Sequence, residues 1–213
     1  MIPLSDSAPR VRFPFINYLL ILANIYVFYL QLTSPDFEAF IVQWAFIPAN
    51  FSLLNPVAYL PLFAGIFMHG GFLHIISNLW ILHVFGDNVE DYLGHFRFLV
   101  FYLLCGLAAS LAQYFVEPDS VIPLIGASGA ISGVMGAYFD YYRHHTVKTL
   151  IPLGFFYQTA NLPSWIFLGY WFVLQLFSGA GSLSSLESGQ GGVAWFAHIG
   201  GFLFGYLTAR VLQ

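Results

Sequence analysis

Long apolar stretches, separated by short charged clusters, constrain this chain more than any other feature of its sequence. Only 8% of its 213 residues are charged and 59% are hydrophobic, whereas a soluble domain carries about 25% charged residues. The apolar stretches run to roughly 20 residues, which is the length of a helix that crosses the hydrocarbon core of a bilayer. The composition therefore predicts a helical membrane protein with most of its surface facing lipid.

Six of these stretches are predicted to span the membrane. The first follows two arginines and has no small-residue cleavage site near its end, so we interpret it as a retained helix rather than a signal peptide. No charge run, low-complexity linker or internal repeat indicates a second domain, and we expect a single domain over residues 1–213. The predicted helices are 14–32, 71–85, 96–115, 126–142, 162–177 and 193–212.

The basic residues favour six spans over seven. The apolar region 57–85 is too long for one untilted span, so we divide it at Gly70-Gly71 and assign Leu53–Met68 to an external loop packed on or into the membrane surface. With six spans and a cytoplasmic N-terminus, all six Lys and Arg residues lie on the cytoplasmic side, in agreement with the positive-inside rule. A seventh span would place Arg97 and the later basic residues outside.

Two connections between the spans have a distinctive composition. Ser178–Gly192 is rich in glycine and serine and is expected to form a flexible external loop. Leu150–Asn161 contains a proline and a glycine and is expected to be a cytoplasmic connection that touches the membrane. The only cysteine, Cys105, excludes internal disulfides, and the net charge of −4 gives no indication of nucleic-acid binding.

This topology brings four polar residues to one depth in the outer half of the bilayer. Spans two, four and six all begin on the outer side, so their first turns lie at a similar depth. His74 and Asn78 share one face of span two because they are four residues apart. Ser128 and His198 lie near the starts of spans four and six. Polar groups at this depth are costly unless they contact one another or water.

These four residues have the chemistry that nucleophilic acyl transfer requires. Serine becomes a good nucleophile when a base removes its proton, and His198 is the candidate base for Ser128. The N-terminus of a helix favours a developing oxyanion, and Asn78 and His74 can donate hydrogen bonds to the same oxygen. No acidic residue within the membrane stands near His198 in the sequence, so we expect a dyad whose histidine is oriented by packing.

The glycines of spans four and six have alternative interpretations. Gly126 and Gly129 allow a substrate backbone to approach closely. A Gly-x-Ser-Gly pattern in a membrane helix is, however, more often a surface for helix packing than a nucleophile site. Gly201 and Gly205 form a Gly-x-x-x-Gly pattern, which predicts close packing of span six against span four.

The remaining polar residues favour structural roles. Glu90 and Arg97 flank the turn between spans two and three, where a salt bridge or a helix cap is more common than catalysis. The other histidines have no carboxylate or cysteine at ligand spacing, so no metal site is expected. The chemistry of Ser128 and His198 requires no metal or organic cofactor, and none is expected.

The chain resembles the rhomboid family of intramembrane serine proteases at these residues. Each matching motif is weak alone, but together they occur in family order over residues 60–210 and are highly specific. The motifs are His69-Gly70-Gly71, His74-x-x-x-Asn78, Glu90 through Gly94 to Arg97, Gly126-Ala127-Ser128-Gly129 and Ala197-His198-x-x-Gly201-x-x-x-Gly205.

The resemblance implies an all-α membrane protein, a six-transmembrane-helix rhomboid-like bundle with a membrane-associated first external loop. It also implies a Ser128–His198 dyad and an oxyanion site formed by the Ser128 backbone N–H, His74 and Asn78. Rhomboid proteases cleave transmembrane segments of other proteins near the outer membrane face. Their fifth helix and the loop that follows it are thought to gate entry of the substrate; here these are 162–177 and 178–192.

Two positions depart from the family pattern. Many members carry a Trp-Arg pair in the first external loop, whereas here Trp44 is followed by an alanine. Some members place an aromatic residue one turn after the serine to stack on the catalytic histidine, whereas this chain has Ser132. Another group must then hold His198, and the neighbouring Trp195 and Phe196 are candidates.

Two other functions stay open on the sequence alone. A rhomboid-like protein without activity could bind membrane clients, although such relatives usually lose the serine or the histidine. A small transporter is the third candidate, but no inverted repeat supports it. The expected partners are transmembrane protein substrates and the lipid bilayer, with no nucleic acid. The expected location is the plasma membrane of a prokaryote, with both termini in the cytoplasm.

Overall fold

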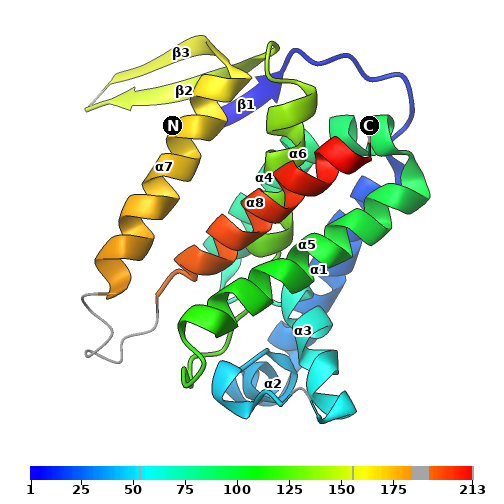
Figure 1. Cartoon of the computed structure of the whole chain (residues 1–213), viewed down its shortest axis with the longest axis vertical. Coiled ribbons are helices and arrows are strands. Elements are labelled where there is room, and N and C mark those ends of the chain that lie inside the picture. The colour runs from blue at the N-terminus through cyan, green and yellow to red at the C-terminus, as the bar shows by residue number, and fades with distance from the viewer. Residues whose placement is uncertain (53, 155, 184–191, 213) are drawn as a thin grey trace.

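The computed structural model describes residues 1–52, 54–154, 156–183 and 192–212, and most of these residues are helical. Within them, a long helix lies at each of the six predicted ranges (Figure 1). The six helices are α1 (Phe15–Thr33), α4 (Phe72–Leu93), α5 (His95–Val116), α6 (Ser128–Tyr141), α7 (Ser164–Leu183) and α8 (Trp195–Val211).

Three of these helices, α1, α5 and α7, are long and apolar enough to cross a bilayer alone. A fourth span is obtained when α4 is combined with Pro56–Phe67, which meets it at a bend of 83°. With 14 and 17 residues, α6 and α8 are shorter than the roughly 20 residues that span a hydrocarbon core. Residues 129–138 of α6 are all buried, so this helix lies inside the bundle. The full count of six spans stays a prediction.

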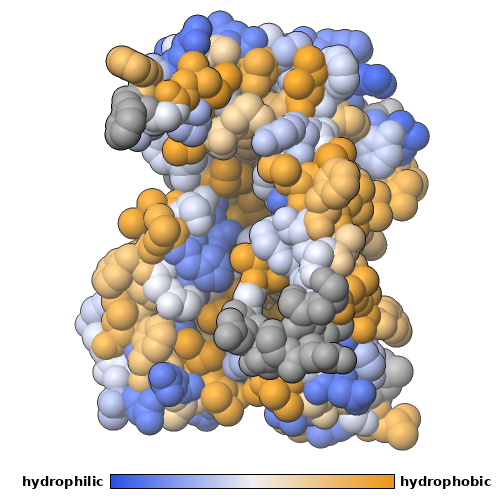
Figure 2. Space-filling model, turned by 90° about the vertical axis from the view of Figure 1, so that its left-hand side faces the viewer, coloured by the Kyte–Doolittle hydropathy of each residue, from blue (hydrophilic) through white to orange (hydrophobic). Residues whose placement is uncertain are grey.

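The surface between the two ends of the molecule is hydrophobic. Large apolar side chains are exposed on the outer helices, including Leu22 on α1, Phe115 on α5 and Phe177 on α7. Figure 2 shows hydrophobic side chains across the middle of one face and hydrophilic ones gathered toward its two ends. This pattern matches a molecule surrounded by lipid, in which an apolar side chain gains nothing by turning inward.

A three-stranded antiparallel sheet covers one end of the bundle (Figure 1). Its strands are β1 (Ile2–Asp6), β2 (Thr146–Leu153) and β3 (Phe156–Pro163), in the order β1-β2-β3. The β2–β3 hairpin occupies the segment Leu150–Asn161, for which the sequence predicted a connection that touches the membrane and no strand. The prediction of an all-α fold is therefore wrong in this part, because the sheet depends on pairing between Ile2 and Leu150, which are far apart in the chain.

The external connections also differ from the sequence prediction. The predicted loop over Leu53–Met68 contains several short helices, among them α3 (Leu60–Ala64), and it follows a further helix, α2 (Phe37–Trp44). Helix α7 continues to Leu183, so the first six residues of the predicted loop Ser178–Gly192 are helical. Residues 184–191 of that loop lie outside the described part of the chain.

Glu90 holds the start of α1 against the end of α4. Its buried carboxylate accepts hydrogen bonds from the backbone N–H groups of Ile16 at 2.8 Å and Asn17 at 2.6 Å. These donors belong to the first turn of α1, where no intrahelical acceptor is available. The carboxylate also contacts Nδ1 of His95 at 2.5 Å. The sequence predicted a salt bridge or a helix cap for Glu90. The structure shows that Glu90 caps a helix, and that helix is α1.

Helices α6 and α8 pack with their backbones almost in contact. A β-carbon added at Gly201 would overlap the carbonyl oxygen of Gly129, and one added at Gly205 would overlap that of Gly133. The prediction that Gly201 and Gly205 pack span six against span four is confirmed. Only glycine permits this distance, because any other residue would place a side-chain carbon on the neighbouring backbone.

Replacing Glu90 with alanine should destabilise the protein strongly. Two buried N–H groups of α1 would lose their acceptor, and each unsatisfied group costs about 1–3 kcal/mol. The temperature of thermal unfolding in detergent measures the loss. The matched control is Glu38→Ala, which removes an exposed carboxylate from the first turn of α2 and should shift this temperature little. Equal shifts for the two variants would contradict the capping role.

The variant Gly205→Ala tests the α6–α8 contact. The added methyl group forces the two backbones apart, and such overpacking costs about 1–3 kcal/mol or more. Unfolding by SDS titration should show this destabilisation. In the control Gly169→Ala, on α7, the new β-carbon meets only a ring carbon of Phe139 at 4.0 Å, so stability should be kept or slightly increased. A neutral effect of Gly205→Ala would show that the helices do not need glycine there.

Candidate active site

Ser128 and His198 are in hydrogen-bond contact. Ser128 is the first residue of α6, at the end of that helix distant from the sheet, and His198 lies in the first turn of α8. The distance from Oγ of Ser128 to Nε2 of His198 is 2.8 Å, although the residues are 70 positions apart in the chain. The close packing of α6 on α8 brings together the two side chains that the sequence singled out.

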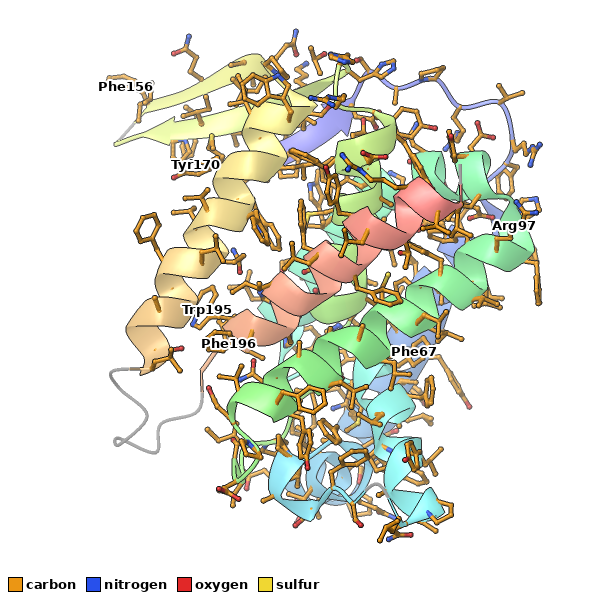
Figure 3. All side chains as sticks on the ribbon, in the orientation of Figure 1. Phe67, Arg97, Phe156, Tyr170, Trp195 and Phe196 are labelled. Carbon is orange, nitrogen blue, oxygen red and sulfur yellow. The ribbon has the colours of Figure 1, made fainter. Side chains whose placement is uncertain are left out.

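His198 is held by groups from two helices. Its Nδ1 lies 2.8 Å from Oε1 of Gln175 on α7. The centroids of the Trp171 and Trp195 rings lie 6.0 Å and 6.2 Å from that of the imidazole. Trp195 is one of the two candidates that the sequence suggested, and it begins α8 on the side of α7 (Figure 3). The other candidate, Phe196, instead directs its ring toward Gly179 of α7.

A ring nitrogen of His74 and the hydroxyl of Ser128 both lie beside Gly126. Nδ1 of His74 accepts a hydrogen bond from the backbone N–H of Gly70 at 3.3 Å, which leaves the proton on Nε2. This Nε2 lies beside Gly126, where an added β-carbon would be 2.7 Å from Nε2 and 3.7 Å from Oγ of Ser128. Asn78 lies one turn further along the same face of α4, and its Nδ2 donates to the carbonyl of His74 at 3.0 Å. His74 and Asn78 thus both offer side-chain donors to the cavity that Ser128 also lines.

Gly126 and Gly129 differ in their surroundings. Gly126 has a φ of +118°, which strongly favours glycine, and its missing side chain leaves room for His74. A β-carbon added at Gly129 would lie 2.6 Å from that of Ala109 on α5. The geometry thus favours helix packing as the role of Gly129, rather than the expected contact with a substrate.

An open cavity of about 910 Å³ contains these groups. Figure 2 shows hydrophilic side chains in a hollow of this otherwise largely hydrophobic face. Side chains from α4, α6, α7 and α8 line the cavity together with the segment after α5. Its lining includes His74, Asn78, Ser128, Trp171 and His198. Because the cavity is open and Ser128 lines it, solvent can reach the serine.

Two glutamines near the site were missed at the sequence level. Gln175 contacts His198, and Gln113 on α5 accepts a hydrogen bond from the backbone N–H of Ala197 at 3.1 Å. The second bond satisfies one of the free N–H groups at the start of α8, which has no cap from its own preceding residue. A signal was present, since each glutamine interrupts a long apolar stretch and a polar residue in such a stretch needs a partner.

A metal site finds no support in the described residues. They contain no group of three or more His, Cys, Asp or Glu side chains placed to hold an ion. His69 and His74 form a pair of neighbouring imidazoles, with ring centroids 5.1 Å apart at an angle of 70°, and the described residues add no third ligand to this pair. The arrangement of donors and acceptors around Ser128 can activate a hydroxyl and bind an oxyanion through protein groups alone.

A family model described as the Rhomboid domain matches residues 57–213. This chain belongs to the rhomboid family. The rhomboid protease GluP of Bacillus subtilis is 33% identical over 124 residues, which cover 58% of this chain and 24% of that protein. RHOMBOID-like protein 5 of Arabidopsis thaliana is 28% identical over 147 residues, with coverage of 69% and 42%. The chain spans less than half the length of these relatives.

The variant Gly126→Ala tests the geometry around His74. The added methyl group overlaps the imidazole of His74. The alanine must also adopt a positive φ, and such backbone strain costs about 1–3 kcal/mol. We expect the rate of covalent labelling of Ser128 by a fluorophosphonate probe to fall at least about tenfold, because one tenfold step corresponds to about 1.4 kcal/mol.

Gly71→Ala is the matched control for this variant. Gly71 lies in the neighbouring turn before α4, has an extended backbone, and has no atom within 4 Å of an added β-carbon. Its labelling rate should stay close to that of the wild type. If both variants are labelled at the wild-type rate, the position of the His74 ring does not depend on the space at Gly126.

Proposed function

We propose that this protein is an intramembrane serine endopeptidase that cleaves transmembrane segments of other proteins near the outer membrane face. The main support is the hydrogen bond of 2.8 Å between Oγ of Ser128 and Nε2 of His198. This pair lies in an open cavity within an apolar helical bundle. Membership of the rhomboid family favours the same class of reaction.

The first half of the proposed reaction forms an acyl-enzyme. As Oγ of Ser128 attacks the scissile carbonyl carbon, Nε2 of His198 takes the hydroxyl proton. The resulting oxyanion accepts hydrogen bonds from the Ser128 backbone N–H, Nε2–H of His74 and the second hydrogen on Nδ2 of Asn78. His198 then returns the proton to the leaving nitrogen, the C–N bond breaks, and the acyl group stays on the serine as an ester.

The second half releases the acyl group. A water molecule in the cavity gives a proton to Nε2 of His198 as its oxygen attacks the ester carbonyl. The same three donors hold the new oxyanion. The ester C–O bond then breaks, His198 returns the proton to Ser128, and the product leaves with a carboxyl terminus. The protein groups suffice for both halves, so the proposed reaction needs no cofactor.

The distribution of basic residues supports an orientation in the membrane. Most of the basic residues lie toward the sheet end of the molecule: some precede α1, one lies at the start of α5, and others follow α6. The one at the start of α5 is Arg97 (Figure 3). By the positive-inside rule the sheet end faces the cytoplasm, so both termini are cytoplasmic and Ser128 lies in the outer half of the membrane. We propose the plasma membrane of a prokaryote as the location. Similar proteins also include ones named as mitochondrial and chloroplastic.

The decisive experiment compares the wild type with Ser128→Ala and His198→Ala in proteoliposomes. Labelling by a fluorophosphonate and cleavage of a reporter transmembrane segment should both occur in the wild type and be lost in the two variants. Ser34→Ala, at the C-terminal end of α1, is the serine control and should cleave normally. His74→Ala and Asn78→Ala should each lower kcat by about 10²- to 10³-fold, which is typical of losing one oxyanion donor.

Other outcomes would favour the rival functions. A folded wild type that is neither labelled nor able to cleave would contradict the proposal and favour a client-binding role. Solute flux through the proteoliposomes without any cleavage would favour a transporter. Cleavage retained by Ser128→Ala would exclude Ser128 as the nucleophile.

A further inference from the structure

We propose that Gln175 is a positioning residue that sets the tautomer and orientation of His198, and that it makes the activity of the site depend on the position of α7. The inference rests on the proposed protease function and deepens it by naming a regulatory contact of the same site. It concerns a side chain that the reaction itself does not require as donor or base.

The hydrogen bonds of Gln175 determine which end of its amide meets the histidine. Its Nε2 donates to the carbonyl oxygen of Trp171, one turn earlier on α7, at 3.3 Å. The amide oxygen therefore faces His198, and Oε1 lies 2.8 Å from Nδ1. Since an amide oxygen can only accept, Nδ1 must carry the proton. The other ring nitrogen, Nε2, is then free to accept the hydroxyl hydrogen of Ser128.

Loss of this contact would allow the wrong tautomer. With the proton on Nε2, His198 could not take a proton from Ser128, and the site would lack its base. Gln175 is buried, so water does not readily replace its oxygen. Other titratable groups that line the cavity are His74 on α4 and Glu117 after α5, whereas Gln175 is the group that meets Nδ1.

The position of Gln175 links the histidine to a peripheral helix. Helix α7 lies at the edge of the bundle beside α8 (Figure 1). Its outer side carries Tyr170 (Figure 3), which is exposed, and Leu174 is exposed as well. Trp171 and Gln175 are one turn apart on its inner side, and both approach His198. A movement of α7 away from α8 would remove both contacts together. His198 is therefore oriented for catalysis only while α7 stands against α8.

The first test measures the tautomer of His198 directly by NMR. The full chain, labelled with ¹⁵N-histidine and purified in detergent, is compared as wild type, Gln175→Leu and Gln175→Glu; a His198→Gln variant identifies the signal. The wild type and Gln175→Glu should show the Nδ1–H tautomer, because both offer an oxygen acceptor. Gln175→Leu should show a mixture. The Nδ1–H tautomer unchanged in Gln175→Leu would overturn the proposal, whether or not the protein proves to be a protease.

The second test measures kcat and KM of the same variants with a transmembrane peptide substrate. Gln175→Leu should lower kcat about 10- to 100-fold with little change in KM, because the loss affects the base and not substrate binding. Gln175→Glu should recover most of kcat. Leu174→Ala, on the exposed side of the same helix, is the control and should leave kcat unchanged.

The outcomes of the two tests separate positioning from general stability. Equal losses in Gln175→Leu and Gln175→Glu, with lowered unfolding temperatures in both, would show a structural role only and overturn the proposal. A wild type without any cleavage would overturn the proposed protease function, while the tautomer measurement would still decide whether Gln175 positions His198.

Discussion

The near-contact between the backbones of α6 and α8 is the constraint on which the site depends. Gly201 and Gly205 lie directly on the carbonyl groups of Gly129 and Gly133, and this contact places the first residue of α6 beside the first turn of α8. In lipid, helix association relies on close packing, since apolar side chains gain little by leaving a hydrocarbon solvent. The 2.8 Å contact of Ser128 with His198 is a consequence of that packing.

Buried polar side chains then secure the helix ends around this pair. Glu90 caps the start of α1, Gln113 binds a free N–H at the start of α8, and Gln175 holds the ring of His198. Each of these groups would be costly in an apolar interior without its partner. The partner of each group lies on another helix, so these hydrogen bonds connect α4 to α1, α5 to α8 and α7 to α8. The site thus combines the closely packed central helices with two side chains, Trp171 and Gln175, from the peripheral α7.

The sequence predicted most of the helices because apolar length is a local property. The stretches around 14–32 and 96–115 match α1 and α5 within a residue or two. The ends of α4 and α7 were placed too early, since polar or small residues such as those after Phe85 and Phe177 continue a helix when tertiary contacts support them. The sheet was missed because β1 pairs with residues more than 140 positions away.

The sequence by itself determined the membrane class and the family, and it singled out four polar residues as the candidate site. It could do so because hydropathy, charge asymmetry and the order of motifs are properties of the linear sequence. Only the tertiary structure decided which groups surround His198. Ser132 stands where some family members have an aromatic ring that stacks on the histidine, so no residue one turn after Ser128 can hold His198 in that way. The contact of 2.8 Å between His198 and Gln175 instead arises from the packing of α7 on α8. Such a contact depends on helix rotation and separation in space, and no spacing within one segment encodes it.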